Sequence, residues 1–400
     1  MTTFTEQNAS TTRPYPETAE GVVARVNELV PVLRERARET EKLRRMHPDN
    51  LDDLTNAGAF KLTLPKDAGG YEAEPRVITE VLAQIARGCP STSWIAALMS
   101  AVTFWAALLP DEGSEEVLAT PDLRITGLIA PTGKAVDAEG GVVVNGQWNW
   151  NTGGVHSQWL GLAALRQTEN GPFPVALVVP ASEVTMQDNW DASGMSGTAT
   201  NIITAENVFV PNSRIIDVPS LANGHFPQRK YSNNPYFNRP AVQFFMVGSA
   251  PTMLGMARGA MDVFMEKLPS RSITYTNYST ATDAALTHHQ VAKAQFELEI
   301  AEMYMRKMED LLLSTNGKEV PFENRIKTRA WLGQVATHAK ACVNQLFEAS
   351  GASQIQHSAH LQRYFRDVNS LSLHALIQPS TSDELYGRFL CGLEPNTTFV

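Results

Sequence analysis

Hydrophobic positions divide the chain into three stretches that differ in their periodicity. Between Glu17 and Ala59 they recur every three or four residues, as on one face of an α-helix. The same spacing predicts two further helices, over Val77–Ala86 and Ser93–Leu109, before a break at Pro110. Residues 1–15 are rich in Thr, Asn and Ser, and we expect them to be disordered. The chain therefore begins with a predicted helical domain.

After Pro121 short β-like runs alternate with turns such as Asn145-Gly146, which predicts a small antiparallel β-domain. Residues 221–240 are typical of an irregular linker, and long helical segments follow, including Gln290–Leu313 and Ala330–Ser350. The fold class is therefore mainly α with a central β-domain. Its predicted divisions are an N-terminal helical domain over 16–120, a middle β-domain over 121–225 and a C-terminal helical bundle with a tail over 226–400.

Composition narrows the class of protein. The 400 residues are 43% hydrophobic and carry a net charge of −9, which argues against a nucleic-acid or anionic-membrane partner. No apolar run is long enough to span a membrane, and no secretory signal precedes the first helix. Three widely spaced cysteines suit a reducing compartment, so we expect a cytoplasmic protein.

Two kinds of binding motif are missing from the sequence. There is no Gly-x-Gly-x-x-Gly between a strand and a helix and no P-loop, so a nicotinamide-binding module is not evident. The pairs His288-His289 and His357…His360 lack acidic or Cys partners at ligand spacing, and we predict no metal site.

Three ordered stretches carry a resemblance to a known family. They are Gly146-Gln-Trp-Asn-Trp-Asn-Thr-Gly153, Trp190-Asp-Ala-Ser-Gly-Met-Ser-Gly-Thr198, and Arg366-Asp367 after Glu348-Ala-Ser-Gly351. In this order they resemble the acyl-CoA dehydrogenase superfamily over nearly the whole chain. The resemblance implies an N-terminal helical domain, a β-barrel-like middle domain and a C-terminal four-helix bundle, assembled as a homotetramer.

The sequence departs from the dehydrogenases near Arg366-Asp367. Many of them place a catalytic glutamate eight residues beyond the Asp, where this chain has Ala375, and no carboxylate lies between Val368 and Ser382. Alanine cannot accept a proton as a general base does. The departure weakens dehydrogenation without excluding it, since some branches of the family carry the acid elsewhere.

Other segments resemble one branch of the family, the two-component flavin-dependent monooxygenases. These segments are Cys89-Pro-Ser-Thr-Ser-Trp94, Ile273-Thr-Tyr-Thr276, Thr287-His-His-Gln290, His374 and Leu385-Tyr-Gly-Arg388. The resemblance implies an oxygenase that takes reduced FMN or FADH2 from a separate NAD(P)H:flavin reductase. With O2 it forms a C4a-hydroperoxyflavin and oxygenates a small molecule.

The resemblance also assigns residues to the cofactor. His374 and Thr152 would stabilise the peroxide as catalytic groups. Contacts to the flavin would come from Trp94, Trp150, Thr152, Gly194, Gly197, Thr198, Arg271, Gln290 and Gly351. In the family Arg271, Gln290 and Gly351 act across a subunit interface, with the arginine on a flavin phosphate. Each type of residue also has an ordinary structural explanation, such as a tryptophan that packs in a β-core.

The substrate is the least determined part of the prediction. Phenol hydroxylases of this branch hold the phenol with a histidine on the helix that here reads Ala96 to Phe104 and has none. Ser100, Thr103 and Arg239 are the candidate substrate contacts, and an aromatic or polyketide-like molecule is the expected substrate. Three alternatives stay open: an FAD-dependent acyl-CoA dehydrogenase, an N-hydroxylase of an amine, and a non-catalytic flavin-binding protein.

Overall fold

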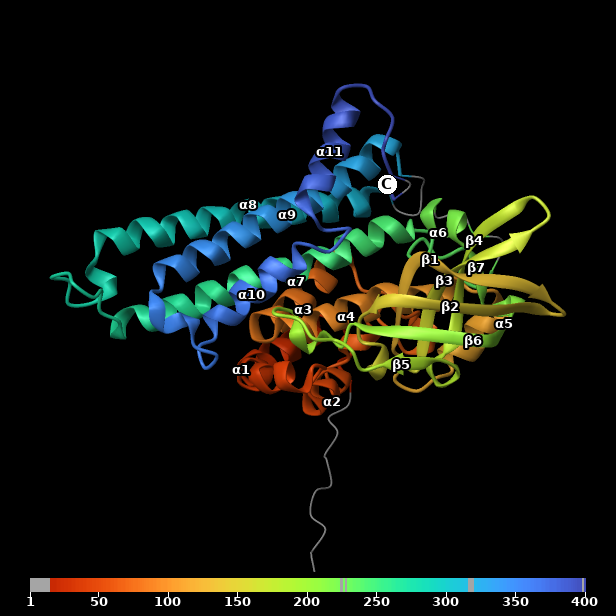
Figure 1. The fold of residues 1–400 in the computed structure, drawn as a ribbon, viewed down its shortest axis with the longest axis horizontal. Helices are drawn as coiled ribbons and strands as arrows, with labels where there is room; N and C mark the ends of the chain where they lie inside the picture. The colour runs from red at the N-terminus through yellow and green to blue at the C-terminus, as the bar shows by residue number, and fades with distance from the viewer. Residues whose placement is uncertain (1–14, 224–225, 227–228, 316–319, 398) are drawn as a thin grey trace, which may run out of the picture.

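The computed structural model describes residues 15–223, 226, 229–315, 320–397 and 399–400. The expected disorder of residues 1–15 therefore lies outside the described residues, apart from Tyr15. The described chain forms a long helical region at one end and a β-domain at the other (Figure 1).

The N-terminal helices follow capping and proline signals. Thr18 accepts a hydrogen bond from the Gly21 N–H at 3.2 Å and caps the first helix. That helix ends at Arg44, which has a left-handed φ of 55°, so the single helical region expected from Glu17 to Ala59 is two helices. Cys89 is extended because Pro90 follows it, and this separates the next two helices. The elements are α1 (Ala19–Leu43), α2 (Pro48–Asn56), α3 (Pro75–Gly88), α4 (Pro90–Thr103) and α5 (Asp111–Leu118), the last beginning where the sequence predicted only a break.

The β-domain is a seven-stranded sheet in the order β5-β6-β2-β1-β3-β4-β7. Its strands are β1 (Ile125–Ala138), β2 (Gly141–Asn151), β3 (Trp159–Thr168), β4 (Gly171–Pro180), β5 (Thr185–Gln187), β6 (Asn201–Pro211) and β7 (Ile215–Asp217). The prediction of an antiparallel domain was wrong at one pair, because β1 and β3 are parallel. The β1–β2 hairpin occupies one edge of β1, so the returning chain pairs with the other edge.

The C-terminal region is built from long helices. They are α6 (Val218–Asn223), α7 (Ala241–Lys267), α8 (Ala285–Thr315), α9 (Phe322–Ala349), α10 (Leu361–Leu371) and α11 (Pro379–Leu390). Helices α7, α8 and α9 pack on one another, and α10 lies against α7 and α9. Helix α7 also packs on α3 and α4, which joins the two helical regions into one core.

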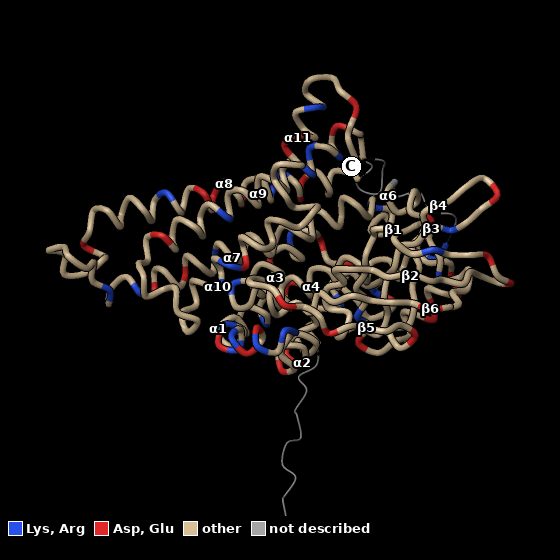
Figure 2. Tube along the Cα trace, in the orientation of Figure 1, with Lys and Arg blue, Asp and Glu red and all other residues tan. Residues whose placement is uncertain are grey.

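The distribution of charged side chains agrees with this packing. Lys, Arg, Asp and Glu are frequent on α1 and α8, whereas α4 carries none (Figure 2). Contrary to the expectation that no apolar run is long enough to span a membrane, the segment Pro90–Leu108 has the length and hydropathy of such a span, but all of it is buried inside the protein. Burial of this kind is typical of a core helix.

Candidate flavin site

Two rings from distant parts of the chain meet at the centre of the candidate site. Trp94 lies in the second turn of α4, and His374 follows the C-terminus of α10. Their ring centroids are 5.2 Å apart with an interplanar angle of 71°. The fold thus brings together two residues that the resemblance assigns separately to the flavin.

Hydrogen bonding fixes the state of the histidine. His374 Nδ1 accepts from the Leu376 backbone N–H at 3.3 Å, so we infer that the neutral ring carries its proton on Nε2. Burial lowers the pKa of the imidazole to about 4. His374 is therefore neutral at physiological pH and presents an N–H donor.

A loop from the β-domain forms the next part of the site. Asp367 on α10 is buried and accepts from the Met195 N–H at 2.6 Å. Arg366 donates to the Ser193 carbonyl at 2.6 Å and pairs with Glu41 of α1. The Arg-Asp pair therefore holds residues 193–195 against α10. Burial raises the pKa of Asp367 to about 7.

The glycines of this loop allow its close packing. A Cβ at Gly197 would lie 2.5 Å from Thr40 Cγ2 and 3.1 Å from Ser91 Cβ. A Cβ at Gly194 would collide with the Arg366 carbonyl. Both glycines thus have a packing role, and Thr198 beside them is fully buried.

Thr152 begins the turn that follows β2 and is buried with its hydroxyl 2.8 Å from the Thr200 hydroxyl. The Thr126 hydroxyl donates to the Thr152 carbonyl at 2.7 Å. A Cβ on the neighbouring Gly153 would lie 2.8 Å from Ile95, the residue next to Trp94. Thr152, Trp94 and His374 therefore belong to one region of the structure.

Trp150 occupies a bulge near the end of β2. Trp148 pairs with Ile203 and Asn151 with Asn201, so two residues on β2 oppose one on β6. Trp150 has a left-handed φ of 70° and is 67% exposed, with its ring edge-on to Trp190 at 5.8 Å. Trp148, in contrast, is buried in the β-core and donates to the Ala163 carbonyl.

Three of the predicted cofactor residues lie elsewhere. Arg271 donates to the Ala349 carbonyl at 2.6 Å, and its Nη2 is 3.5 Å from a Cβ built on Gly351. Gln290 is half-buried near the start of α8. The loop between α7 and α8 and the C-terminus of α9 lie at the end of the helical region far from the β-domain (Figure 1). One chain therefore does not bring these residues to Thr152.

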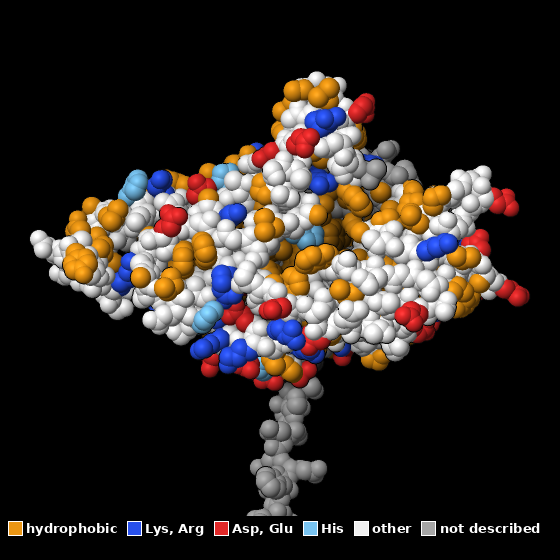
Figure 3. Space-filling model, viewed as in Figure 1, with side chains coloured by type: hydrophobic (Ala, Val, Ile, Leu, Met, Phe, Trp, Pro, Cys, Tyr) orange, Lys and Arg blue, Asp and Glu red, His pale blue; other side chains and the backbone are white. Residues whose placement is uncertain are grey.

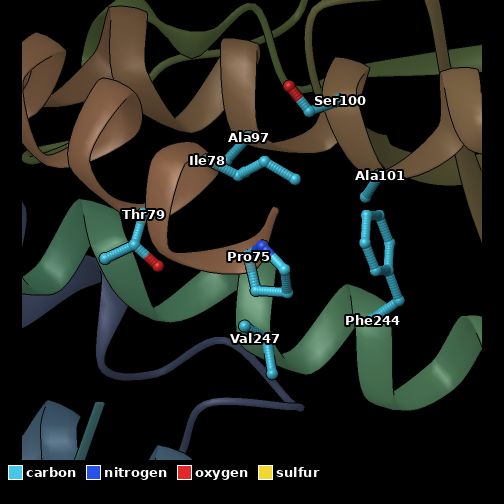
Figure 4. A pocket seen from close by; sticks show the side chains of 9 residues that line it. Pro75, Ile78, Thr79, Ala97, Ser100, Ala101, Phe244 and Val247 are labelled. Atoms are coloured by element: carbon cyan, nitrogen blue, oxygen red, sulfur yellow. The ribbon is translucent and has the colours of Figure 1, made fainter. Parts of the chain in front are cut away.

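Two of the candidate substrate residues, Ser100 and Thr103, belong to α4, and the third, Arg239, precedes α7. Ser100 lines a cavity whose other walls are mainly apolar, with its hydroxyl directed away from Phe244 (Figure 4). Thr103 and Arg239 are buried but do not line this cavity. Arg239 pairs with Glu74 at 3.3 Å and stacks over Tyr236. Figure 3 shows a hollow with hydrophobic side chains between the β-domain and the base of α11.

Comparison with known proteins shows the family to which the chain belongs. The profile of the acyl-CoA dehydrogenase C-terminal domain matches residues 247–379. The chain is 30% identical over 380 residues to the flavin-dependent monooxygenase oxygenase subunit HsaA of Rhodococcus jostii, covering 94% of this chain and all of the relative. This chain belongs to the flavin-dependent monooxygenase oxygenase subunits.

Solved structures agree with this membership. A crystal structure of 3-HSA hydroxylase from a Rhodococcus species superposes with a TM-score of 0.88 at 30% identity, covering 95% of this chain and 99% of that one. XiaF from a Streptomyces species, in complex with FADH2 and glycerol, gives a TM-score of 0.87 at 26% identity, covering 95% and 97%. The predicted acyl-CoA dehydrogenase-like fold is confirmed at this level.

The residues of this oxygenase subunit fit a reduced flavin. Trp150 offers an exposed aromatic surface, Trp94 is a buried ring against His374, and Thr152 and His374 offer an uncharged hydroxyl and an N–H donor. When bound, reduced flavin supplies the electrons that activate O2. Among residues 15–223, 226, 229–315, 320–397 and 399–400, no group of three His, Cys, Asp or Glu is placed to hold a metal ion.

Two residues of interest were missed from the sequence. Thr200 contacts the hydroxyls of both Thr152 and Thr198. Gln243 is 1% exposed, and neither polar atom of its amide has a hydrogen-bond partner in the described part of the chain. A Thr-x-Thr spacing was the visible signal for the first. A polar residue in an apolar helix was the signal for the second.

Proposed function

We propose that this oxygenase component binds reduced FMN or FADH2 beside Trp94, Thr152 and His374 and uses O2 to hydroxylate an aromatic or polyketide-like small molecule. The contact between Trp94 and His374 is the observation that carries the proposal. The buried Thr152 hydroxyl lies in the same region, because a Cβ on the adjacent Gly153 would lie 2.8 Å from Ile95, the residue next to Trp94. Thr152 and His374 are uncharged hydrogen-bonding groups, which can orient a flavin and its bound oxygen without abstracting a proton.

The substrate is held by Ser100, Thr103 and Arg239 in this proposal. The hydroxyls of Ser100 and Thr103 and two guanidinium nitrogens of Arg239 are buried without a partner in the described part of the chain. A buried polar group without a partner costs free energy that a bound ligand can recover. Polar substituents on an otherwise apolar substrate would recover this cost where they reach these groups, of which Ser100 alone lines the cavity between α3, α4 and α7.

Assembly completes the site in this proposal. Arg271, Gln290 and Gly351 of one subunit reach the flavin of a neighbour in a homotetramer, with Arg271 on the phosphate. Their distance from Thr152 within one chain supports the idea. A separate NAD(P)H:flavin reductase supplies the reduced flavin in the cytoplasm. The divisions 16–120, 121–225 and 226–400 are the proposed N-terminal helical domain, β-barrel-like domain and C-terminal four-helix bundle.

A stopped-flow experiment tests the function. The protein with pre-reduced FMN is mixed with oxygenated buffer, and flavin absorbance is followed. We expect reoxidation through a persistent species, well slower than for free FMN. Reoxidation at the rate of free flavin, together with reduction of bound FAD by an acyl-CoA, would instead indicate a dehydrogenase. Binding of reduced flavin without either behaviour would indicate a non-catalytic flavin-binding protein.

A further inference from the structure

Three threonine hydroxyls form a continuous row that leads away from the proposed flavin position. Thr198 Oγ1 lies 2.8 Å from the Met195 carbonyl oxygen and 2.7 Å from Thr200 Oγ1. Thr200 Oγ1 in turn lies 2.8 Å from Thr152 Oγ1. All three distances are those of ordinary O–H···O hydrogen bonds.

The direction of the row follows from counting protons. A carbonyl oxygen only accepts, so Thr198 must donate its single hydroxyl proton to Met195. Thr200 must then donate to Thr198, and Thr152 must donate to Thr200. Every proton in the row is used, and Thr152 Oγ1 is left with lone pairs only. Its remaining hydrogen-bonding capacity is therefore that of an acceptor.

The end of the row at the Met195 carbonyl is held in place by several hydrogen bonds. Met195 has a left-handed φ of 53°, and its N–H donates to the buried Asp367 at 2.6 Å. Its carbonyl also accepts from the Trp190 indole N–H at 2.9 Å. Thr198 is fully buried, so its hydroxyl has no water to turn toward. Reversing the row would leave the Thr198–Met195 hydrogen bond unmade in the interior.

We propose that Thr198 and Thr200 are positioning residues that hold the Thr152 hydroxyl as an acceptor and so make the site prefer reduced over oxidised flavin. This inference rests on the proposed function and adds to it that the Thr152 hydroxyl faces the flavin N5. N5 carries a hydrogen in reduced flavin and only a lone pair in oxidised flavin. A hydrogen-bond acceptor at Thr152 therefore favours reduced flavin, whose N5–H can donate to it, and disfavours oxidised flavin, whose N5 lone pair would face another lone pair.

The size of the preference follows from the hydrogen bond involved. A hydroxyl that can rotate freely would donate to oxidised flavin and accept from reduced flavin equally well. Holding it as an acceptor removes one hydrogen bond from the oxidised complex. A hydrogen bond of this kind corresponds to about a tenfold change in affinity. For a two-electron couple, tenfold equals about 30 mV in midpoint potential.

The test variant is Thr200→Val, which removes the middle hydroxyl but keeps the shape of the side chain. Dissociation constants of oxidised and reduced FMN are measured anaerobically, with the midpoint potential of the bound flavin. We expect the preference for reduced FMN to fall about tenfold and the potential to become about 30 mV more negative. Thr200→Ser should restore both values, and Thr198→Val should change both in the same direction as Thr200→Val.

Thr126→Val is the matched control. Its hydroxyl donates to the Thr152 carbonyl and not to the hydroxyl row, so the preference should stay at the wild-type value. If Thr200→Val weakened the binding of oxidised and reduced FMN equally, the role of Thr200 would be merely structural and the inference would be overturned. An unchanged preference would overturn it too. Failure of the wild-type protein to bind reduced FMN at all would instead overturn the proposed function.

Discussion

Replacing Asp367 with Asn tests how the buried carboxyl supports the loop at the site. Asp367 is 1% exposed, and burial raises its pKa from the ordinary value of 3.8 to about 7. This difference corresponds to about 4 kcal/mol in the free energy of unfolding. Asn keeps the shape of the side chain and an oxygen that can accept from the Met195 N–H.

The sign of the pH effect follows from the raised pKa. Below about pH 4 the carboxyl is protonated in both folded and unfolded protein, and its contribution to stability is fully present. Between about pH 4 and 7 the unfolded chain loses this proton first, so wild-type stability falls as pH rises. Asn at this position does not titrate. The variant should therefore gain up to about 4 kcal/mol relative to wild type across this range.

Urea unfolding followed by circular dichroism at several pH values between 4 and 8 measures this difference. Titrating groups far from position 367 contribute equally to both proteins, so the difference between the two unfolding free energies reports on Asp367 and its charged neighbour Glu41. A difference that does not change with pH would refute the reasoning. It would mean that Asp367 ionises in the folded protein as it does in the unfolded chain.

Three further predictions concern the site. His374→Ala should leave folding and flavin binding nearly intact but divert oxygen to free hydrogen peroxide, because the neutral N–H donor is lost. The ratio of product formed to O2 consumed measures this diversion, and an unchanged ratio would contradict the role of His374. Gly197→Ala should weaken flavin binding several-fold in titrations, because its Cβ would press on Thr40, whereas Gly387→Ala, with open space around it, should not. Arg271→Ala should weaken FMN binding by about ten- to a hundredfold but leave the affinity for riboflavin, which lacks the phosphate, unchanged. Equal losses of affinity for both ligands would refute a phosphate contact.

Periodicity was sufficient to predict that helices, strands and then long helices follow one another along the chain, but not every element or how the elements connect. The break at Arg44 was invisible because a non-glycine residue adopts the left-handed conformation there. The parallel pairing of β1 and β3 depends on which edge of β1 is free after the hairpin forms, a tertiary property. Helix α5 was missed because Pro110 and Gly113 indicated a turn, whereas Pro110 in fact precedes its first residue.

The site was predictable only through resemblance. Trp94 and His374 are separated by hundreds of positions, and no pattern within either segment indicates their contact. The packing of Gly197 and the anchoring of Met195 by Asp367 depend on side-chain distances that a sequence does not contain. The role of Thr200 depends on the direction of a hydrogen-bonded row, which follows only once the three oxygen–oxygen distances are known.

The Arg-Asp pair shows how one scaffold supports different chemistry. In this chain Asp367 is directed at the Met195 N–H, and Arg366 binds the same loop, so both side chains serve the architecture of the site. The position eight residues beyond Asp367 is Ala375, and its neighbour His374 is neutral because burial lowers its pKa to about 4. In the proposed site, uncharged hydrogen-bonding groups thus stand where many dehydrogenases of the superfamily have a carboxylate. Such groups suit a reaction whose reactive species comes from the flavin and O2, with the protein providing orientation and protection from water.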